Sequence, residues 1–309
     1  MSATSWIGVS ADSLVSPRLP SALAGSVFLT AIVWQWGLIG FVVAGLLFHE
    51  PYLILHSTEA RPYTLWLLLN YIYLIFFHKA FFSSLEEQTP AQRRLNLCFF
   101  SLSAILLAFV ASGSLFLLLG TLLWVVFFQS KRIWDGGLAL APALLILAYY
   151  LVVPTIDCTN FPGKNGIHSL AGTIPHGDYI LIKGVIRLVF SKPLVDLPIY
   201  LAGIFGLFLA WRKNLSPQKN EKKELFSLLV IFGFALFSTA AAIAYKNYYF
   251  VPRLFLFVLA GKAVFLCITL NILSEAAQSK FKYKNHILFV IMGALAVYPF
   301  ITIFLELKR

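Results

Sequence analysis

Residues 20–57 read PSALAGSVFLTAIVWQWGLIGFVVAGLLFHEPYLILHS, and Glu50 is the only formally charged side chain among them. The stretch is about twice as long as the roughly 20 apolar residues that one membrane-spanning helix needs. We therefore predict two spans in it, at 20–36 and 37–57.

The same apolar pattern recurs along the rest of the chain. Further runs lie at 63–80, 95–111, 114–129, 137–153, 193–211, 225–245, 251–273 and 287–305. The sequence therefore predicts an all-α fold, in which residues 1–309 form a single membrane domain. This domain is a polytopic transmembrane helical bundle of about ten spans.

The composition excludes a soluble protein. Of the 309 residues, 60% are hydrophobic and only 12% are charged, and the mean hydropathy is +0.83. A soluble domain carries about 25% charged residues. The net charge of +11 lies mainly at the ends of apolar runs and lacks the pattern of a nucleic-acid groove, so membrane lipid is the expected partner and nucleic acid is not.

Basic residues between the runs predict the orientation of the chain. Those on one side are Lys79, Arg93, Arg94, Lys131, Arg132, Arg212, Lys213, Lys219, Lys222, Lys223, Lys280, Lys282 and Lys284. The positive-inside rule makes that side cytoplasmic. We expect a multi-pass protein of the plasma (inner) membrane, with the loop 154–192 on its outer face.

The loop 154–192 is the longest connection, and loops of this length are usually functional. Its stretch 180–190 is apolar except for Lys183 and Arg187, which share one helical face. This pattern predicts a helix on the membrane surface. Either the two cations anchor that helix at the interface, or they hold a lipid phosphate over the mouth of an active site.

Titratable side chains gather at the outer end of the second predicted span. Four of them recur every three or four residues: His49, Tyr52, His56 and Glu59. On a continuous helix they would line one face pointing away from lipid. The stretch 49–63 is therefore the most informative one for residues that could carry chemistry.

Three charged residues near this stretch need partners or a role. Glu50 lies well inside its span, where an unpaired carboxylate costs about 3 kcal/mol or more. It is either protonated or paired with a cation, for which Lys262, also deep in its span, is a candidate. Arg61 precedes Pro62, which favours a tight bend. Glu59 and Arg61 there either cap a helical hairpin as an ion pair or belong to the site.

Two further polar stretches lie on the predicted outer side. In residues 246–253, KNYYFVPR, the aromatics either form an interfacial belt or accompany an Arg253 that binds an anionic head group. His168, His176 and Asp178 have no metal-ligand spacing, and we predict exposed loop residues there. We expect neither a metal site nor a Gly-rich phosphate loop.

Three stretches of the chain resemble segments of one family. They are WIGVS (6–10) with PRLPSALAG (17–25), STEARPYTL (57–65) and YYFVPRLFL (248–256). In this order they resemble the GT-C superfamily of membrane glycosyltransferases, specifically the bacterial relatives of dolichyl-phosphate-mannose protein mannosyltransferases and of the lipid A aminoarabinose transferase. The second stretch is similar to the family's Glu-Ala-Arg-x-Tyr segment and is the most specific.

The resemblance implies a GT-C-like fold and a cell-envelope enzyme. This enzyme would transfer a sugar from a polyprenyl-phosphate-linked donor to an acceptor at the outer face of the membrane. The donor is a substrate, and no cofactor is implied. The candidate ligands of the donor phosphate are Arg61, Arg253, Lys183 and Arg187. The candidate supporting residues are Glu59, Tyr63, His56 and Glu50. Preplaced cations of this kind stabilise a leaving phosphate.

The catalytic base has no counterpart in this sequence. The family carries its catalytic aspartate in an outer loop that precedes the segment resembled by the start of this chain. Asp12 aligns downstream of that loop, so it is not assigned as the base. We expect the loop to come either from a preceding segment of a longer chain or from an N-terminal partner subunit.

Two other functions stay open at this point. Glu50 and Lys262 inside predicted spans are also typical of a transporter or flippase for a lipid-linked substrate. A chain without the catalytic loop could alternatively be a non-catalytic GT-C-like scaffold that binds the donor lipid.

Overall fold

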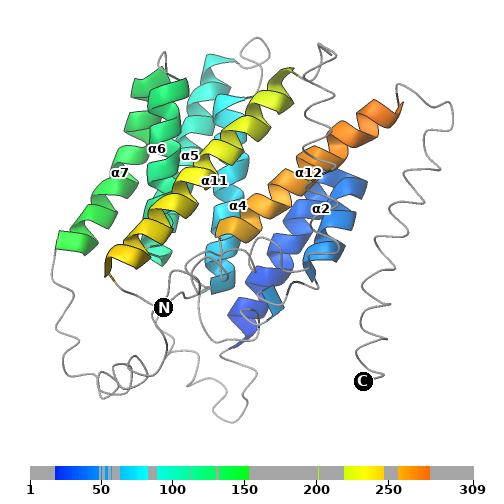
Figure 1. The fold of residues 1–309 in the computed structure, drawn as a ribbon, viewed down its shortest axis with the longest axis horizontal. Coiled ribbons are helices and arrows are strands. Elements are labelled where there is room, and N and C mark those ends of the chain that lie inside the picture. Colours follow the sequence, from blue (N-terminus) through cyan, green and yellow to red (C-terminus); the bar gives the residue numbers. More distant parts are fainter. Residues whose placement is uncertain are drawn as a thin grey trace.

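The computed structural model describes residues 18–48, 50, 53, 54, 57, 63–82, 89–111, 113–129, 132–152, 201, 219–246 and 257–278. All regular structure in this part of the chain is helical (Figure 1). Its helices are α2 (Leu19–Phe48), α4 (Tyr63–Phe81), α5 (Pro90–Val110), α6 (Ser114–Phe128), α7 (Ile133–Val152), α11 (Lys219–Lys246) and α12 (Phe257–Gln278). For these residues the all-α prediction is confirmed.

Three of the helices, α2, α4 and α5, are long and apolar enough to cross a membrane by length and composition. Shorter apolar helical segments lie in α6, α7, α11 and α12. Many outward side chains are also apolar, and Trp34 and Phe237 are 90% and 73% exposed. Soluble proteins rarely expose large apolar patches, so these surfaces support membrane association. The figure of about ten spans stays a prediction.

The helices follow the predicted apolar runs, with differences at their ends. α5 begins at Pro90 instead of residue 95 because its polar first turn is also helical. Thr89 caps this turn: its hydroxyl accepts a hydrogen bond from the Gln92 N–H, while the Gln92 side chain accepts one from the Thr89 N–H. Hydropathy alone misses such a polar start. Apart from residue 201, the runs at 193–211 and 287–305 lie outside the described residues.

α2 is two helical arms joined at Gly37, which has a φ of 55° and a ψ of −126°. Glycine adopts a positive φ without the steric penalty of a side chain. A Cβ at Gly40 would lie 2.2 Å from the Ile32 carbonyl oxygen, although residues eight apart on a straight helix are separated by about 12 Å. The arms therefore fold back on each other, at the boundary predicted between the runs 20–36 and 37–57 (Figure 1).

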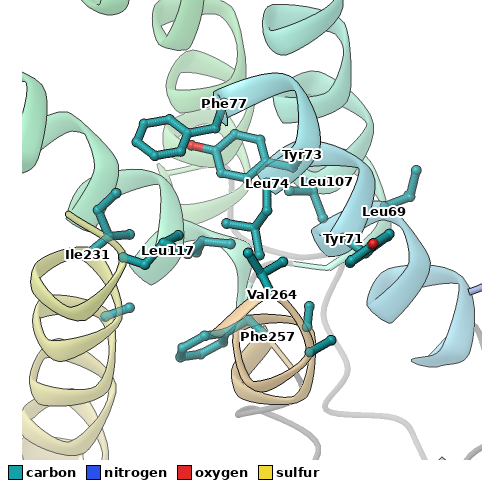
Figure 2. Close-up of a cluster of buried hydrophobic side chains, with 14 of the residues drawn as sticks. Leu69, Tyr71, Tyr73, Leu74, Phe77, Leu107, Leu117, Ile231, Phe257 and Val264 are labelled. Carbon is teal, nitrogen blue, oxygen red and sulfur yellow. The ribbon is translucent and has the colours of Figure 1, made fainter. Parts of the chain in front are cut away.

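α4 lies between α2, α5 and α12, while α6 packs on α7 and α11. Aromatic rings fill the space between α4, α5 and α6: Phe77 stacks edge-on against Trp124 at 5.0 Å between ring centroids. Tyr73 and Phe77 belong to the buried cluster shown in Figure 2, where α12 passes beside α4 and α11. Ring pairs of this kind add stabilisation beyond their buried area.

α12 is enclosed by its neighbours. Every position from Phe257 to Val264 is buried, and Lys262 is the only charged residue among them. Gly261 makes room for α11, because a Cβ there would lie 2.4 Å from the ring of Phe232. α12 also contacts α2 and α4, so its Lys262 is carried into the interior of the bundle.

Candidate functional site

The first stretch of the family resemblance packs directly on the second. Gly25 of α2 faces residues 57 and 64: a Cβ there would lie 2.7 Å from the Ser57 Oγ and 3.7 Å from the Thr64 Cγ2. The buried Thr64 hydroxyl donates a 2.7 Å hydrogen bond to the Ser21 carbonyl oxygen. A glycine at this position thus lets the start of α4 approach the start of α2.

The helix preceding the second stretch is interrupted at Glu50. The Glu50 N–H donates a 2.8 Å hydrogen bond to the Leu47 carbonyl oxygen, and the Glu50 carbonyl oxygen accepts a 3.1 Å hydrogen bond from the Ile54 N–H. The cause is Pro51, which has no N–H to continue the ladder and disfavours helix at the preceding residue. The predicted continuous helical face therefore does not run unbroken through this position.

Glu50 and Lys262 form an ion pair inside the bundle. The Lys262 Nζ lies 3.6 Å from the Glu50 Oε2, and only 3% of each side chain is exposed. This confirms that Glu50 is paired with Lys262, which was one of the two predicted alternatives. The separation exceeds the roughly 3.2 Å limit of a good hydrogen bond. The other carboxylate oxygen, Oε1, is buried and accepts no hydrogen bond from the described residues.

The ion pair links the backbone break to α12. Burying two charges is expensive, and their attraction offsets that penalty only while both are present. Removal of one partner from a buried pair typically costs about 3–5 kcal/mol. The pair therefore restrains the chain at Glu50 against the first turns of α12. We call the group Ser21, Gly25, Glu50, Ser57, Thr64 and Lys262 the α2–α4–α12 junction.

The structure describes two of the residues predicted for the site. Glu50 lies in the junction, and the half-buried Tyr63 is the first residue of α4, next to Thr64. The other predicted site residues lie outside the described residues: His56, Glu59, Arg61, Lys183, Arg187 and Arg253. The loop 154–192 with its surface helix 180–190, the remaining histidines of the outer face and Asp178 also lie outside them.

A second polar cluster lies at the opposite end of α4. Asp135 of α7 pairs with Arg93 of α5 and lies 3.8 Å from the Nε of Arg132. Arg132 also donates a 2.7 Å hydrogen bond to the Ala80 carbonyl and sits 4.9 Å above the Phe81 ring. Burial lowers the pKa of Arg132, the nearby Arg93 adds to this, and Asp135 opposes it. The Arg132 guanidinium nevertheless stays protonated. Its contacts and the pair of Asp135 with Arg93 join α4, α5 and α7, and we call this cluster the clamp.

Sequence reasoning missed part of both groups. Gly25 belongs to one of the resembling stretches, but nothing in a single sequence marks it as a contact for Ser57. Asp135 had a usable signal, since it is a lone acid beside Arg132 at the start of an apolar run. No metal-binding group of three or more His, Cys, Asp or Glu side chains occurs among the described residues.

An open groove between α6 and α11 is chemically different from the junction. Its lining includes Phe127, Phe128, Phe234 and Phe237, and it has no charged side chain. Such a surface suits contact with lipid chains.

Comparison with known proteins adds no relative. No known protein family, curated protein sequence or solved structure matches this chain.

Proposed function

We propose that the protein is a glycosyltransferase of the GT-C type. In this proposal it transfers a sugar from a polyprenyl-phosphate-linked donor to an acceptor at the outer face of the membrane. The observation that carries the proposal is the contact between two of the resembling stretches, through Gly25, Ser57 and the Thr64–Ser21 hydrogen bond. Stretches that build one site are expected to meet in space, although residues 25 and 57 are far apart in sequence.

The ion pair extends this support to the third stretch. α12 begins at Phe257, directly after residues 248–256, and its Lys262 pairs with Glu50, shortly before residues 57–65. A residue that precedes the stretch 57–65 and a residue that follows the stretch 248–256 therefore meet in the α2–α4–α12 junction. This arrangement favours a site to which Arg61 and Arg253 both contribute.

The proposed chemistry is mainly electrostatic. When the bond between the sugar and the phosphate breaks, negative charge develops on the leaving phosphate. Arg61 and Arg253 would stabilise that charge through bidentate hydrogen bonds, since guanidinium and phosphate geometries match. The acceptor hydroxyl must lose a proton, and no residue of this chain is assigned to accept it.

The test is sugar transfer by an Arg61→Ala variant in the native membrane, with any partner subunit present. We expect transfer to fall about 100- to 1000-fold, as for loss of one preplaced donor to a transition-state anion. The matched control is Arg94→Ala, which removes an exposed arginine of α5. Retained transfer by Arg61→Ala, at equal amounts of folded protein, would refute the assigned role.

A transporter or flippase of a lipid-linked substrate is the second candidate. The buried ion pair beside a broken helix favours it, because transporter sites use discontinuous helices and intramembrane charges. Translocation of a labelled polyprenyl-phosphate sugar in proteoliposomes, without sugar transfer, would select this function over the first.

A further inference from the structure

We infer that Glu50 and Lys262 are a positioning pair, which holds the chain at the break after α2 in register with α12 and thereby supports the donor site of the proposed function. The inference rests on the proposed function and deepens it. Neither side chain is assigned contact with the substrate, because only 3% of each is exposed.

The pair lies where an interrupted helix meets an enclosed one. Glu50 stands where regular helix is interrupted, so the backbone after it is not held by a continuous hydrogen-bond ladder from α2. Lys262 belongs to a turn of α12 that is buried on all sides. An attachment to α12 therefore transfers the rigidity of an enclosed helix to the chain at Glu50.

A contribution to stability alone does not account for this pair. Its 3.6 Å separation is longer than a hydrogen bond, and the Glu50 Oε1 accepts no hydrogen bond from the described residues. Well-packed apolar side chains at such sites are often as stabilising as a buried ion pair. A charged pair has a further property that apolar residues lack: it selects one partner and one register.

Close contacts anchor the chain on either side of the pair. Gly261, the neighbour of Lys262, fits closely under the Phe232 ring, which limits sliding of α12 against α11. On the other side, Thr64 fixes the start of α4 to Ser21. The pair thus joins two regions that are each anchored, so its charges set their relative position.

The kinetic test uses Glu50→Gln, Lys262→Met, the double variant and the exchanged pair Glu50→Lys with Lys262→Glu. We expect each single variant to lower kcat/KM for the donor by about 100-fold, as misplacement of a site by about 1 Å does. The kcat/KM of the double variant should not fall below that of the less active single variant. The exchanged pair should recover a kcat/KM within about tenfold of wild type. The KM for the acceptor should stay unchanged.

A matched control separates positioning from loss of a buried polar group. Thr269 is buried on the same helix, and its Oγ1 has no hydrogen-bond partner among the described residues. Thr269→Val should leave donor kinetics unchanged. A purely structural role of the ion pair would instead reduce the amount of folded protein and leave kcat/KM per folded molecule as in wild type, which would overturn the inference.

A distance measurement distinguishes failure of this inference from failure of the proposed function. Spin labels at Ile54→Cys and Leu145→Cys, both at exposed positions, report where the segment after Glu50 lies relative to α7. Cys98 and Cys158 are replaced by serine. We expect a narrow distance distribution that broadens in Lys262→Met and narrows again in the exchanged pair. A distance distribution that stays unchanged in Lys262→Met refutes the positioning role. If the distribution broadens and narrows as expected but the protein transfers no sugar, only the proposed function is refuted.

Discussion

Gly120 provides the sharpest test of how the helices pack. It lies in α6 facing α11, where a Cβ would be 2.7 Å from the Ile231 carbonyl oxygen and 3.5 Å from the Ala235 nitrogen. These are backbone atoms, which cannot rotate away. Since a carbon atom normally stands roughly 3.4 Å or more from such an oxygen, Gly120→Ala must push the two helices apart by about 0.5–1 Å.

The expected magnitude follows from two opposing effects. Alanine gains about 1 kcal/mol over glycine in a helix interior, whereas overpacking costs about 1–3 kcal/mol. Gly233→Ala in α11 is the matched control, because a Cβ there meets no atom within 4 Å. The helix-propensity gain is common to both variants, so their difference isolates the packing cost. We expect Gly120→Ala to be less stable than Gly233→Ala by about 1–3 kcal/mol.

The assay is reversible unfolding in mixed micelles by titration with SDS, followed by tryptophan fluorescence. Both variants are compared with wild type at the same lipid-to-detergent ratio. Equal free energies of unfolding for the two variants, within about 0.5 kcal/mol, would refute the close approach of α6 and α11.

Two other substitutions test the ends of the bundle by the same titration. Thr64→Val removes the hydrogen bond to Ser21 and should lower the free energy of unfolding by about 1–2 kcal/mol; an unchanged value would contradict the contact between the two stretches. Arg132→Ala removes the bond to the Ala80 carbonyl and should cost about 1–3 kcal/mol. Equal stability of Arg132→Ala and the exposed-site control Arg94→Ala would contradict the clamp.

The positions of the helices could be predicted well because hydropathy depends on local composition. The run at 63–80 corresponds to α4 at Tyr63–Phe81, and the break at Gly37 falls between two predicted runs. Hydropathy places the start of α5 at residue 95, whereas the helix begins at Pro90, since a capped first turn is helical without being apolar. The interruption at Glu50 was also missed, although Pro51 was a local signal for it.

The candidate site could be predicted only in part. The energetic cost of an unpaired charge in a membrane left two alternatives for Glu50, protonation or an ion pair with a cation such as Lys262, and the structure shows the ion pair. The contact of Gly25 with Ser57 and Thr64 could not be predicted, since it depends on the angle and register at which α2 meets α4. The clamp at Asp135 likewise needs three helix ends to meet.

The sequence by itself determined the solvent of this protein and the stretches that become helices. Both follow from the free energy of transferring apolar side chains and hydrogen-bonded backbone into lipid. This free energy depends on the composition of each segment by itself. Only the tertiary structure decided which helices are neighbours and where Glu50, Lys262 and Thr64 meet. In lipid the hydrophobic effect does not draw helices together, so close packing at glycines such as Gly25 and Gly120 and a few polar contacts select the arrangement.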